Sequence, residues 1–259
     1  MARKQIILLV VEGPSDQTAL EAVFERIFNR THIQFYVMHD DLTADMNLRK
    51  TPQDAIKGAR KTFLIQHKVD GFKEKDIKKV VLLSDTDGCF IEDQYIVNDS
   101  RYPGKFFYEE HCIRSSRIND VKKRNQIKSQ RMRMLCGKNE IAGKPFEHYY
   151  MSCNLDHVLH GKNNLIDLQK EEEALAAALK YADDPEAFVN EIVLALFPAQ
   201  SKSYERSWKF IQEGIHSLSR CTNLIWFLFR NNEDLDPSIR AIVMEWYLEQ
   251  QSDGATDRS

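Results

Sequence analysis

The sequence predicts an α/β fold with a mostly parallel sheet of Rossmann type and a helical C-terminal extension. Two short apolar runs, IILLVV at 6–11 and VVLL at 80–83, have the length and the residues of central parallel strands that are buried on both faces. Helical patterns lie between these runs. After residue 164 the sequence shows helical patterns only. Strands that alternate with helices are typical of a parallel sheet with right-handed crossovers.

The first half of the chain alternates regularly. Ser15 is expected to cap the first helix, whose apolar stripe runs from Ala19 to Phe28, and Pro52 is expected at the first position of the second helix. The expected elements are a strand at 6–11, a helix after the turn EGPSD, a strand at 33–38, a helix from 52 to about 69, and a strand at 78–85.

The pattern changes twice along the chain. Residues 89–110 look irregular, residues 113–136 look helical and basic, and a fourth strand is expected at 145–152. Asp184-Pro185 and Asp236-Pro237 are typical helix starts in the second half. We therefore expect three parts: a catalytic domain at 1–164 with a basic insertion at about 89–144, a helical subdomain at 165–251, and a disordered tail at 252–259.

Composition limits the class of protein. The 259 residues carry a net charge of −3, so the whole chain is no polycation, although residues 165–259 alone hold 17 acidic and 9 basic residues. The five cysteines form no CxxC pair, which predicts reduced thiols. The apolar runs are six residues long, against the roughly 20 that a membrane helix needs. We expect a cytoplasmic protein with no membrane contact.

Acidic residues follow two of the predicted strands. Glu12 comes directly after the first, and Asp85 and Asp87 end the third in the sequence LLSDTDG. Ligands of an open parallel sheet bind at the carboxyl ends of its strands. If the two strands are neighbours, three carboxylates meet there and stay ionised only if a cation neutralises them. Hard oxygen ligands suit Mg²⁺ or Mn²⁺. The alternative is that acids simply favour turns at strand ends.

These two motifs resemble a known family. VVEGPSD is similar to the glutamate motif of Toprim domains, and LLSDTDG is similar to their DxD motif, in the same order. The resemblance covers about residues 4–160 and is nearest to the small nucleases of the OLD and RloB-like type. It implies a Rossmann-like Toprim fold and a Mg²⁺- or Mn²⁺-dependent nuclease associated with phage defence, with an ATPase or another defence protein as a candidate partner. The sequence leaves the oligomeric state open, a homo-oligomer included.

The resemblance also implies roles for single residues. Asp85 and Asp87 would bind the metal, and Glu12 would be either a ligand or the base that activates water. The stretch YYMSCNLDHVLHG is similar to a third segment of the RloB-like group, which makes Asp156 a fourth candidate ligand in a place usually held by glutamate. Asp16 is either a group behind the ligands or a favourable charge at a helix N-terminus.

The basic segment 113–136 predicts a nucleic-acid interface. A helix with one buried face would present a basic outer face to a phosphate backbone. The candidate contacts to DNA or RNA are Lys122, Lys123, Arg124, Lys128, Arg131 and Arg133. Two alternatives are a solvated helix and a helix that pairs with the acidic C-terminal half.

Three functions follow from these features. The first is a metal-dependent endonuclease. The second is a phosphatase of the HAD type, because DTDG resembles its nucleophile loop, with Asp85 as nucleophile and Asp87 as acid and base. The third is a binding or regulatory Toprim subunit without catalysis.

Overall fold

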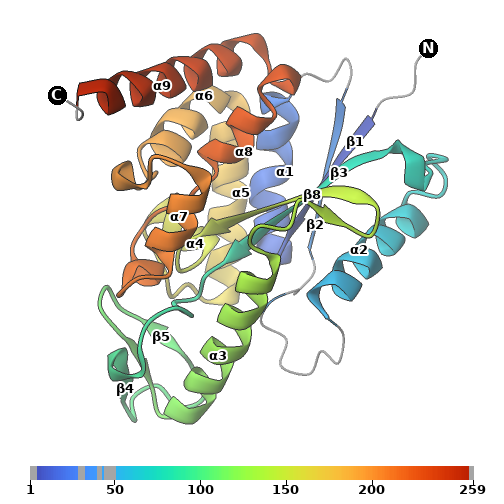
Figure 1. Cartoon of the computed structure of the whole chain (residues 1–259). Coiled ribbons are helices and arrows are strands. Elements are labelled where there is room, and N and C mark those ends of the chain that lie inside the picture. The colour runs from blue at the N-terminus through green and yellow to red at the C-terminus, as the bar shows by residue number, and fades with distance from the viewer. Residues whose placement is uncertain (1–4, 29–32, 40–42, 44–50, 257–259) are drawn as a thin grey trace.

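The computed structural model describes residues 5–28, 33–39, 43 and 51–256, and a five-stranded sheet lies at its centre (Figure 1). The strand order is β2-β1-β3-β8-β7. The first four strands are parallel and β7 pairs antiparallel with β8. The strands are β1 (Gln5–Val11), β2 (Ile33–His39), β3 (Ile77–Asp85), β7 (Glu140–Ile141) and β8 (Lys144–Met151). The predicted α/β class, the mostly parallel sheet and its four main strands are confirmed.

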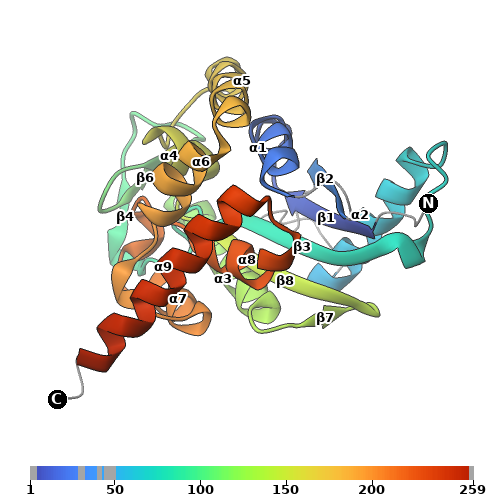
Figure 2. The ribbon, with the colours of Figure 1, turned by 90° about the horizontal axis from the view of Figure 1, so that it is seen from above.

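Side chains of the central strands alternate between two hydrophobic layers. In β1, Ile7 and Leu9 belong to the core under α1 (Pro14–Ile27), whereas Ile6 and Leu8 belong to the core under α2 (Pro52–Gln66). Figure 2 shows α1 and α5 (Asp167–Asp183) together on one side of the strands. Burial on both faces explains why these strands read as continuous apolar runs.

The first helix begins earlier than predicted. Its N-cap is Gly13, so Ser15 lies inside the first turn and the expected cap is wrong. The carboxylate of Asp16 accepts a hydrogen bond from the Gly13 backbone N–H at 2.9 Å, which satisfies one of the free N–H groups at the helix start. This fixes the conformation of the turn that carries Glu12. By contrast, the second helix begins at Pro52 as expected, with Thr51 as its cap.

The segment after β3 forms a small lobe beside the sheet. It is less irregular than expected, because three short strands make a second sheet of order β4-β6-β5. These strands precede the basic helix α3. The bounds are β4 (Ile96–Asn98), β5 (Phe107–Tyr108), β6 (Ile113–Ser115) and α3 (Ile118–Leu135). Figure 1 shows α3 running from this lobe back toward the sheet.

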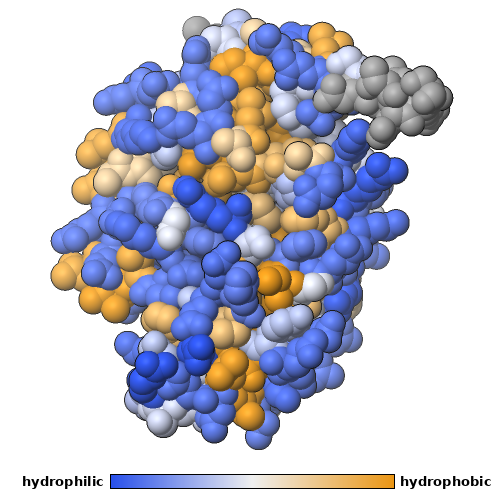
Figure 3. Space-filling view, turned by 90° about the vertical axis from the view of Figure 1, so that its left-hand side faces the viewer, coloured by the Kyte–Doolittle hydropathy of each residue, from blue (hydrophilic) through white to orange (hydrophobic). Residues whose placement is uncertain are grey.

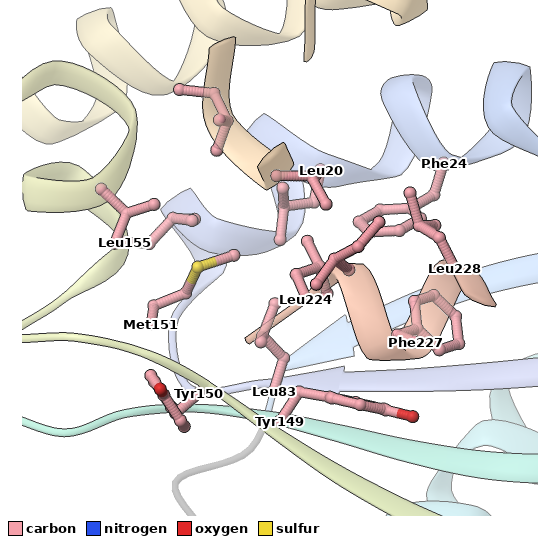
Figure 4. Close-up of a cluster of buried hydrophobic side chains, with 14 of the residues drawn as sticks. Leu20, Phe24, Leu83, Tyr149, Tyr150, Met151, Leu155, Leu224, Phe227 and Leu228 are labelled. Atoms are coloured by element: carbon pink, nitrogen blue, oxygen red, sulfur yellow. The ribbon is translucent and has the colours of Figure 1, made fainter. Parts of the chain in front are cut away.

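The C-terminal half is helical, as predicted, and shares its core with the sheet. The rings of Phe188 and Phe227 lie 6.0 and 5.8 Å from the ring of Phe24 on α1. Figure 4 shows this cluster, in which Leu20 and Phe24 face Leu224 and Phe227. The remaining elements are α4 (Leu155–His160), α6 (Pro185–Ala187) continued by a π-helical segment (Phe188–Leu194), α7 (Tyr204–Ile211), α8 (Ile225–Arg230), α9 (Pro237–Thr256), and short 3-10 turns at Glu74–Asp76, Asp93–Tyr95, Ala199–Ser201, His216–Leu218 and Asn232–Asp234.

Three smaller expectations can be compared with the structure. Residues 252–256 are helical because α9 continues to Thr256, so the expectation of a tail disordered from 252 is wrong for them, and 257–259 lie outside the described residues. All five cysteines are free. None of the helices described is long and apolar enough to cross a bilayer.

On the face drawn in Figure 3, hydrophobic patches are interrupted by hydrophilic side chains.

Candidate functional site

The two acidic motifs lie side by side. Strands β1 and β3 are parallel neighbours, and Val10 pairs with Leu82. Glu12 follows the last residue of β1, and Asp85 is the last residue of β3. Because parallel strands end at the same edge of a sheet, both carboxylates lie at its carboxyl edge, as predicted from the sequence.

The loop after β3 turns sharply to place Asp87. Its φ of 48° and the φ of 64° at Gly88 are both in the left-handed region. A Cβ atom at Gly88 would lie 2.6 Å from Leu218 Cδ2, so only glycine fits there. The Asp87 backbone N–H donates to the carbonyl of Cys153 at 2.6 Å. These constraints hold the second aspartate of the DxD motif in a fixed position.

A buried lysine joins the two motifs. Lys128 of α3 has no exposed side-chain surface, and its Nζ lies 2.8 Å from Glu12 Oε2 and 2.5 Å from Asp87 Oδ2. Its pKa is well above the usual value, because the nearby carboxylates Asp87, Glu12 and Asp85 outweigh the effect of burial. The ammonium is therefore charged, and it bridges side chains from two strands.

A second cation from the same helix holds Asp87 from the other side. Arg124 donates to the Asp87 carbonyl at 2.9 Å and to the Tyr108 hydroxyl at 3.0 Å. That hydroxyl donates to Asp87 Oδ1 at 3.2 Å. Burial would raise the pKa of Asp87, but Lys128 and Arg124 lower it below its usual value. Asp87 is therefore an ionised carboxylate whose charge is well compensated.

Asp85 has no such compensation. Within the described part of the chain, no hydrogen bond or ion pair reaches its carboxylate. Burial, followed by the charges of Asp16, Glu12 and Asp87, raises its pKa well above the usual value. Burial likewise raises the pKa of Asp16 to about 6 and that of Glu12 to about 7. Lys128 and Arg124 thus compensate Asp87 best, Lys170 acts on Asp16, and the ionised forms of Glu12, Asp16 and Asp85 are disfavoured.

Glu12 is held at both oxygens. Oε2 accepts from Lys128, and Oε1 accepts from the Thr43 hydroxyl at 2.5 Å. Thr43 is fully buried. The orientation of the carboxylate is thereby fixed by Lys128 and Thr43.

The donor set fits a divalent metal by its chemistry but not by its present arrangement. Carboxylate oxygens are the ligands that Mg²⁺ and Mn²⁺ prefer, and a surplus of buried negative charge favours a bound cation. However, the described residues contain no group of three or more His, Cys, Asp or Glu side chains already arranged to hold an ion. Lys128 instead holds Glu12 and Asp87. A metal that used these two carboxylates would have to displace the ammonium.

The fourth predicted ligand lies somewhat apart. Asp156, in the first turn of α4, is 3.9 Å from Lys170 Nζ. Burial raises the pKa of Asp156, with Lys170 and Glu173 as its charged neighbours, and its own charge acts on Asp16. Asp156 therefore belongs to the edge of the acidic cluster next to Asp16.

The basic residues of α3 divide into two groups. Arg124 and Lys128 are buried and face the carboxylates, so the expectation that they lie on an outer basic face is wrong. Lys123 and Arg133 are exposed, and Lys122 and Arg131 are half-buried. Lys122 pairs with Asp93 at 3.0 Å, and Arg133 donates to Gln212 at 3.0 Å.

Sequence reasoning missed the role of Arg124 and Lys128 although a signal was present. Val121, Met132 and Leu135 are fully buried, and Arg124 and Lys128 lie on the same face of the helix by their spacing. A cation in the apolar stripe of a helix needs a buried partner of opposite charge. Glu12 and Asp87, which follow two buried strands, are the partners that Lys128 contacts.

A cavity of about 620 Å³ opens beside the carboxylates. Asp85 and Asp87 form part of its wall, and the rest comes from the loop before β5, the N-terminus of α4, and the segment that leads into α5. The aromatic residues of this wall are Tyr102, Phe106, Phe107 and Tyr108, its lysines are Lys105 and Lys170, and its amides are Asn154, Asn163 and Asn164. The acidic cluster is thus accessible to a ligand from one side.

Comparisons of the chain with protein-family models, with curated proteins and with solved structures find no match in any of the three.

Proposed function

We propose that this protein is a divalent-metal-dependent nuclease of the Toprim type that hydrolyses phosphodiester bonds in DNA or RNA. The observation that supports this most strongly is the position of Asp85. Its carboxylate lies at the carboxyl edge of the sheet beside an open cavity, surrounded by three other acids and without a cation of its own. A site with surplus negative charge at the ligand-binding edge of a parallel sheet is suited to a divalent cation and a phosphate.

In this proposal Asp85 would hold the ion, together with Glu12 and Asp87. The bound ion would supply Lewis-acid stabilisation of the phosphate and activation of water. The chain's own residues prepare the site: Arg124 and Tyr108 fix the Asp87 carboxylate, and Thr43 orients Glu12. The pKa of Glu12, raised to about 7 chiefly by burial, also suits a group that accepts a proton near neutral pH.

Lys128 would also stabilise the transition state in such a site. Displaced from Glu12 and Asp87, its ammonium would remain next to the scissile phosphate, where a positive charge stabilises the transition state. The exposed Lys123 and Arg133 on the same helix are suited to more distant phosphates. An association with phage defence, and with an ATPase or another partner, is part of the same proposal through the resemblance.

The phosphatase alternative has weaker support. It requires Asp87 to donate and accept a proton, which needs a pKa near the working pH. Although burial acts to raise it, the pKa of Asp87 is lowered by Lys128 and Arg124. A carboxylate held in this way is a poor proton donor, so Asp87 suits metal binding better than acid catalysis.

One observation favours a non-catalytic binding protein as the second candidate. The Lys128 ammonium already neutralises Glu12 and Asp87. If the lysine cannot leave, the site is a structural salt bridge and the protein binds nucleic acid without cutting it. Titration with Mn²⁺, followed by electron paramagnetic resonance, separates the candidates. Stoichiometric binding that Asp85→Asn abolishes supports the nuclease, and absence of binding supports the non-catalytic protein.

Cleavage itself is tested on labelled single- and double-stranded DNA and RNA with Mg²⁺ or Mn²⁺. We expect Asp85→Asn and Asp87→Asn each to reduce the cleavage rate by at least about 100-fold, since even residues behind metal ligands contribute about 10- to 100-fold. Asp183→Asn, at an exposed position of α5, is the matched control and should keep full activity. Cleavage by Asp85→Asn at the wild-type rate would overturn the proposal.

A further inference from the structure

We infer that the cavity beside Asp85 and Asp87 receives a single unpaired nucleotide, so that the substrate is a single-stranded segment of nucleic acid. This inference rests on the proposed function and names its substrate class. It depends on the size of the cavity, on the side chains of its wall, and on the position of the two aspartates in that wall.

The size of the cavity matches one nucleotide. Its volume of about 620 Å³ lies in the range of pockets that enclose one small molecule, roughly 300–1,000 Å³. Asp85 and Asp87 line this cavity, so a phosphate must enter it to reach them. A base-paired strand can present only its outer backbone to the opening. An unpaired nucleotide, or one turned out of a helix, can also place its base inside the cavity.

The wall has the chemistry of a base-binding surface. Tyr102 and Phe107 are stacked, with ring centroids 4.3 Å apart and an interplanar angle of 15°, and both rings remain half-exposed. Aromatic rings of this kind stack with unpaired bases whatever their sequence. The arrangement is held in place, since Asn164 accepts from the Tyr108 backbone N–H at 2.8 Å and donates to its carbonyl at 2.7 Å. The aromatic surface is thus part of a fixed wall.

Charged side chains line the same cavity. Lys105 and Lys170 are part of its wall, together with Asp85, Asp87 and Asp167. The two lysines are suited to phosphates of the strand, while the base of a bound nucleotide would lie against the aromatic side chains. Strand contacts through these groups carry no preference for sequence.

The test uses oligonucleotides of one sequence with 2-aminopurine at the centre, as single-stranded DNA, as single-stranded RNA and as a blunt duplex. Binding is followed by 2-aminopurine fluorescence in EDTA, so that it is independent of cleavage. We expect the intact protein to bind at least one single strand at least tenfold more tightly than the duplex, with a fluorescence change that reports stacking. The comparison of the DNA and RNA arms identifies the natural source.

Substitutions in the cavity wall test whether the single strand binds in this cavity. Tyr102→Ala and Phe107→Ala should each weaken single-strand binding about tenfold, the usual effect of removing one stacking ring. Tyr102→Phe should bind as the wild type does. Lys105→Glu avoids the risk of disturbing the aromatic wall and should weaken binding several-fold. Lys75→Glu is its control, because Lys75 is exposed in the turn before β3, at the opposite end of that strand from Asp85.

Each outcome decides the inference. Equal binding of single strand and duplex, or equal effects of Lys105→Glu and Lys75→Glu, overturns it. Metal-dependent cleavage of the duplex without cleavage of the single strand also overturns it and leaves the proposed nuclease intact. Tight single-strand binding that depends on Tyr102, with no cleavage by any divalent metal, supports the cavity as a nucleotide site and removes the nuclease instead.

Discussion

At the scale of single residues, Lys128 determines the state of the candidate site. It is fully buried and pairs with Glu12 from β1 and Asp87 from the loop after β3. A buried ammonium between two carboxylates satisfies charges that would otherwise repel, and its removal leaves them without a partner. A metal ion bound by Glu12 and Asp87 would take the position that the Lys128 ammonium now occupies. Lys128 therefore links the stability of the fold to the occupancy of the site.

This leads to a prediction for Lys128→Met. In EDTA at pH 8 we expect the variant to lose about 3–5 kcal/mol of unfolding free energy, since the buried Glu12 loses its cation and Asp87 keeps only Arg124 and the Tyr108 hydroxyl. Addition of Mg²⁺ should recover part of this loss, because a ligand that binds only the folded state stabilises it. Urea unfolding with and without Mg²⁺ measures both effects.

The control for this change is Lys123→Met, at an exposed position of the same helix. It should alter the unfolding free energy by no more than about 0.5 kcal/mol. If Lys128→Met proves as stable in EDTA as the wild type, the ion pairs contribute nothing and Lys128 does not control the site.

At the scale of elements, α3 has two faces with different tasks. Its buried face carries Arg124 and Lys128 to the carboxylates, and its other face leaves Lys123 and Arg133 exposed. The ion pairs of Lys122, Arg124 and Lys128, and of the N-cap residue Arg117, run to Glu12, Asp87, Asp93 and Asp120. None of these acids belongs to the acidic C-terminal half. These ion pairs give no support to the charge pairing considered for this helix, although Arg133 donates to the neutral Gln212 of the C-terminal half. The exposed Lys123 is suited to an external phosphate backbone.

Charge reversal on the outer face tests this task. We expect Lys123→Glu to weaken binding of any oligonucleotide severalfold, and to reduce the slope of log affinity against log salt by about 1. Lys61→Glu makes the same change at an exposed position of α2 and should leave the slope unchanged. The measurement is a fluorescence-anisotropy titration at several salt concentrations. Equal slopes for both variants would remove α3 from the nucleic-acid interface.

At the scale of the whole molecule, one continuous core unites the sheet with the C-terminal helices. Phe24 of α1 packs against Phe188 and Phe227, so the helical half covers one face of the sheet (Figure 4). This packing excludes water from one face of the sheet. The low polarity around the acidic cluster raises the pKa values of Glu12, Asp16 and Asp85. The fold thus stores unfavourable charge at the site, which a bound cation would relieve.

The raised pKa values of these carboxylates predict how the unfolding free energy depends on pH. The folded-state pKa values of Glu12 and Asp16 are raised to about 7 and about 6, so the folded protein holds more protons than the unfolded chain above pH 4.5 or so. The stability linked to these groups is present below that pH and is lost as the pH rises to about 7. In EDTA these carboxylates should therefore lower the melting temperature between pH 5 and pH 7.5, against the opposite contribution of His148, whose pKa burial lowers to about 3. Saturating Mg²⁺ should reduce the fall.

Asp85→Asn is the control for this dependence. It removes the group with the least compensated charge, so the fall in melting temperature should become smaller and the variant should be more stable than the wild type at pH 7.5 in EDTA. A pH dependence of the melting temperature that is the same in Asp85→Asn and in the wild type would contradict the assigned pKa shifts.

The sequence by itself determined the elements and the candidate ligands. Apolar runs such as Ile6–Val11 specify central strands because both faces of a parallel sheet are buried, and Glu12 and Asp85 are placed by the strands that they follow. The tertiary structure alone decided which cations meet these acids. Arg124 and Lys128 read as members of a basic surface, but the packing of Val121 and Met132 turns their face of α3 inward. The tertiary structure also decided that residues 102–108 and residues between 154 and 170 line a cavity beside Asp85. Such contacts depend on how segments that are separate in the sequence pack together, and not on a local pattern.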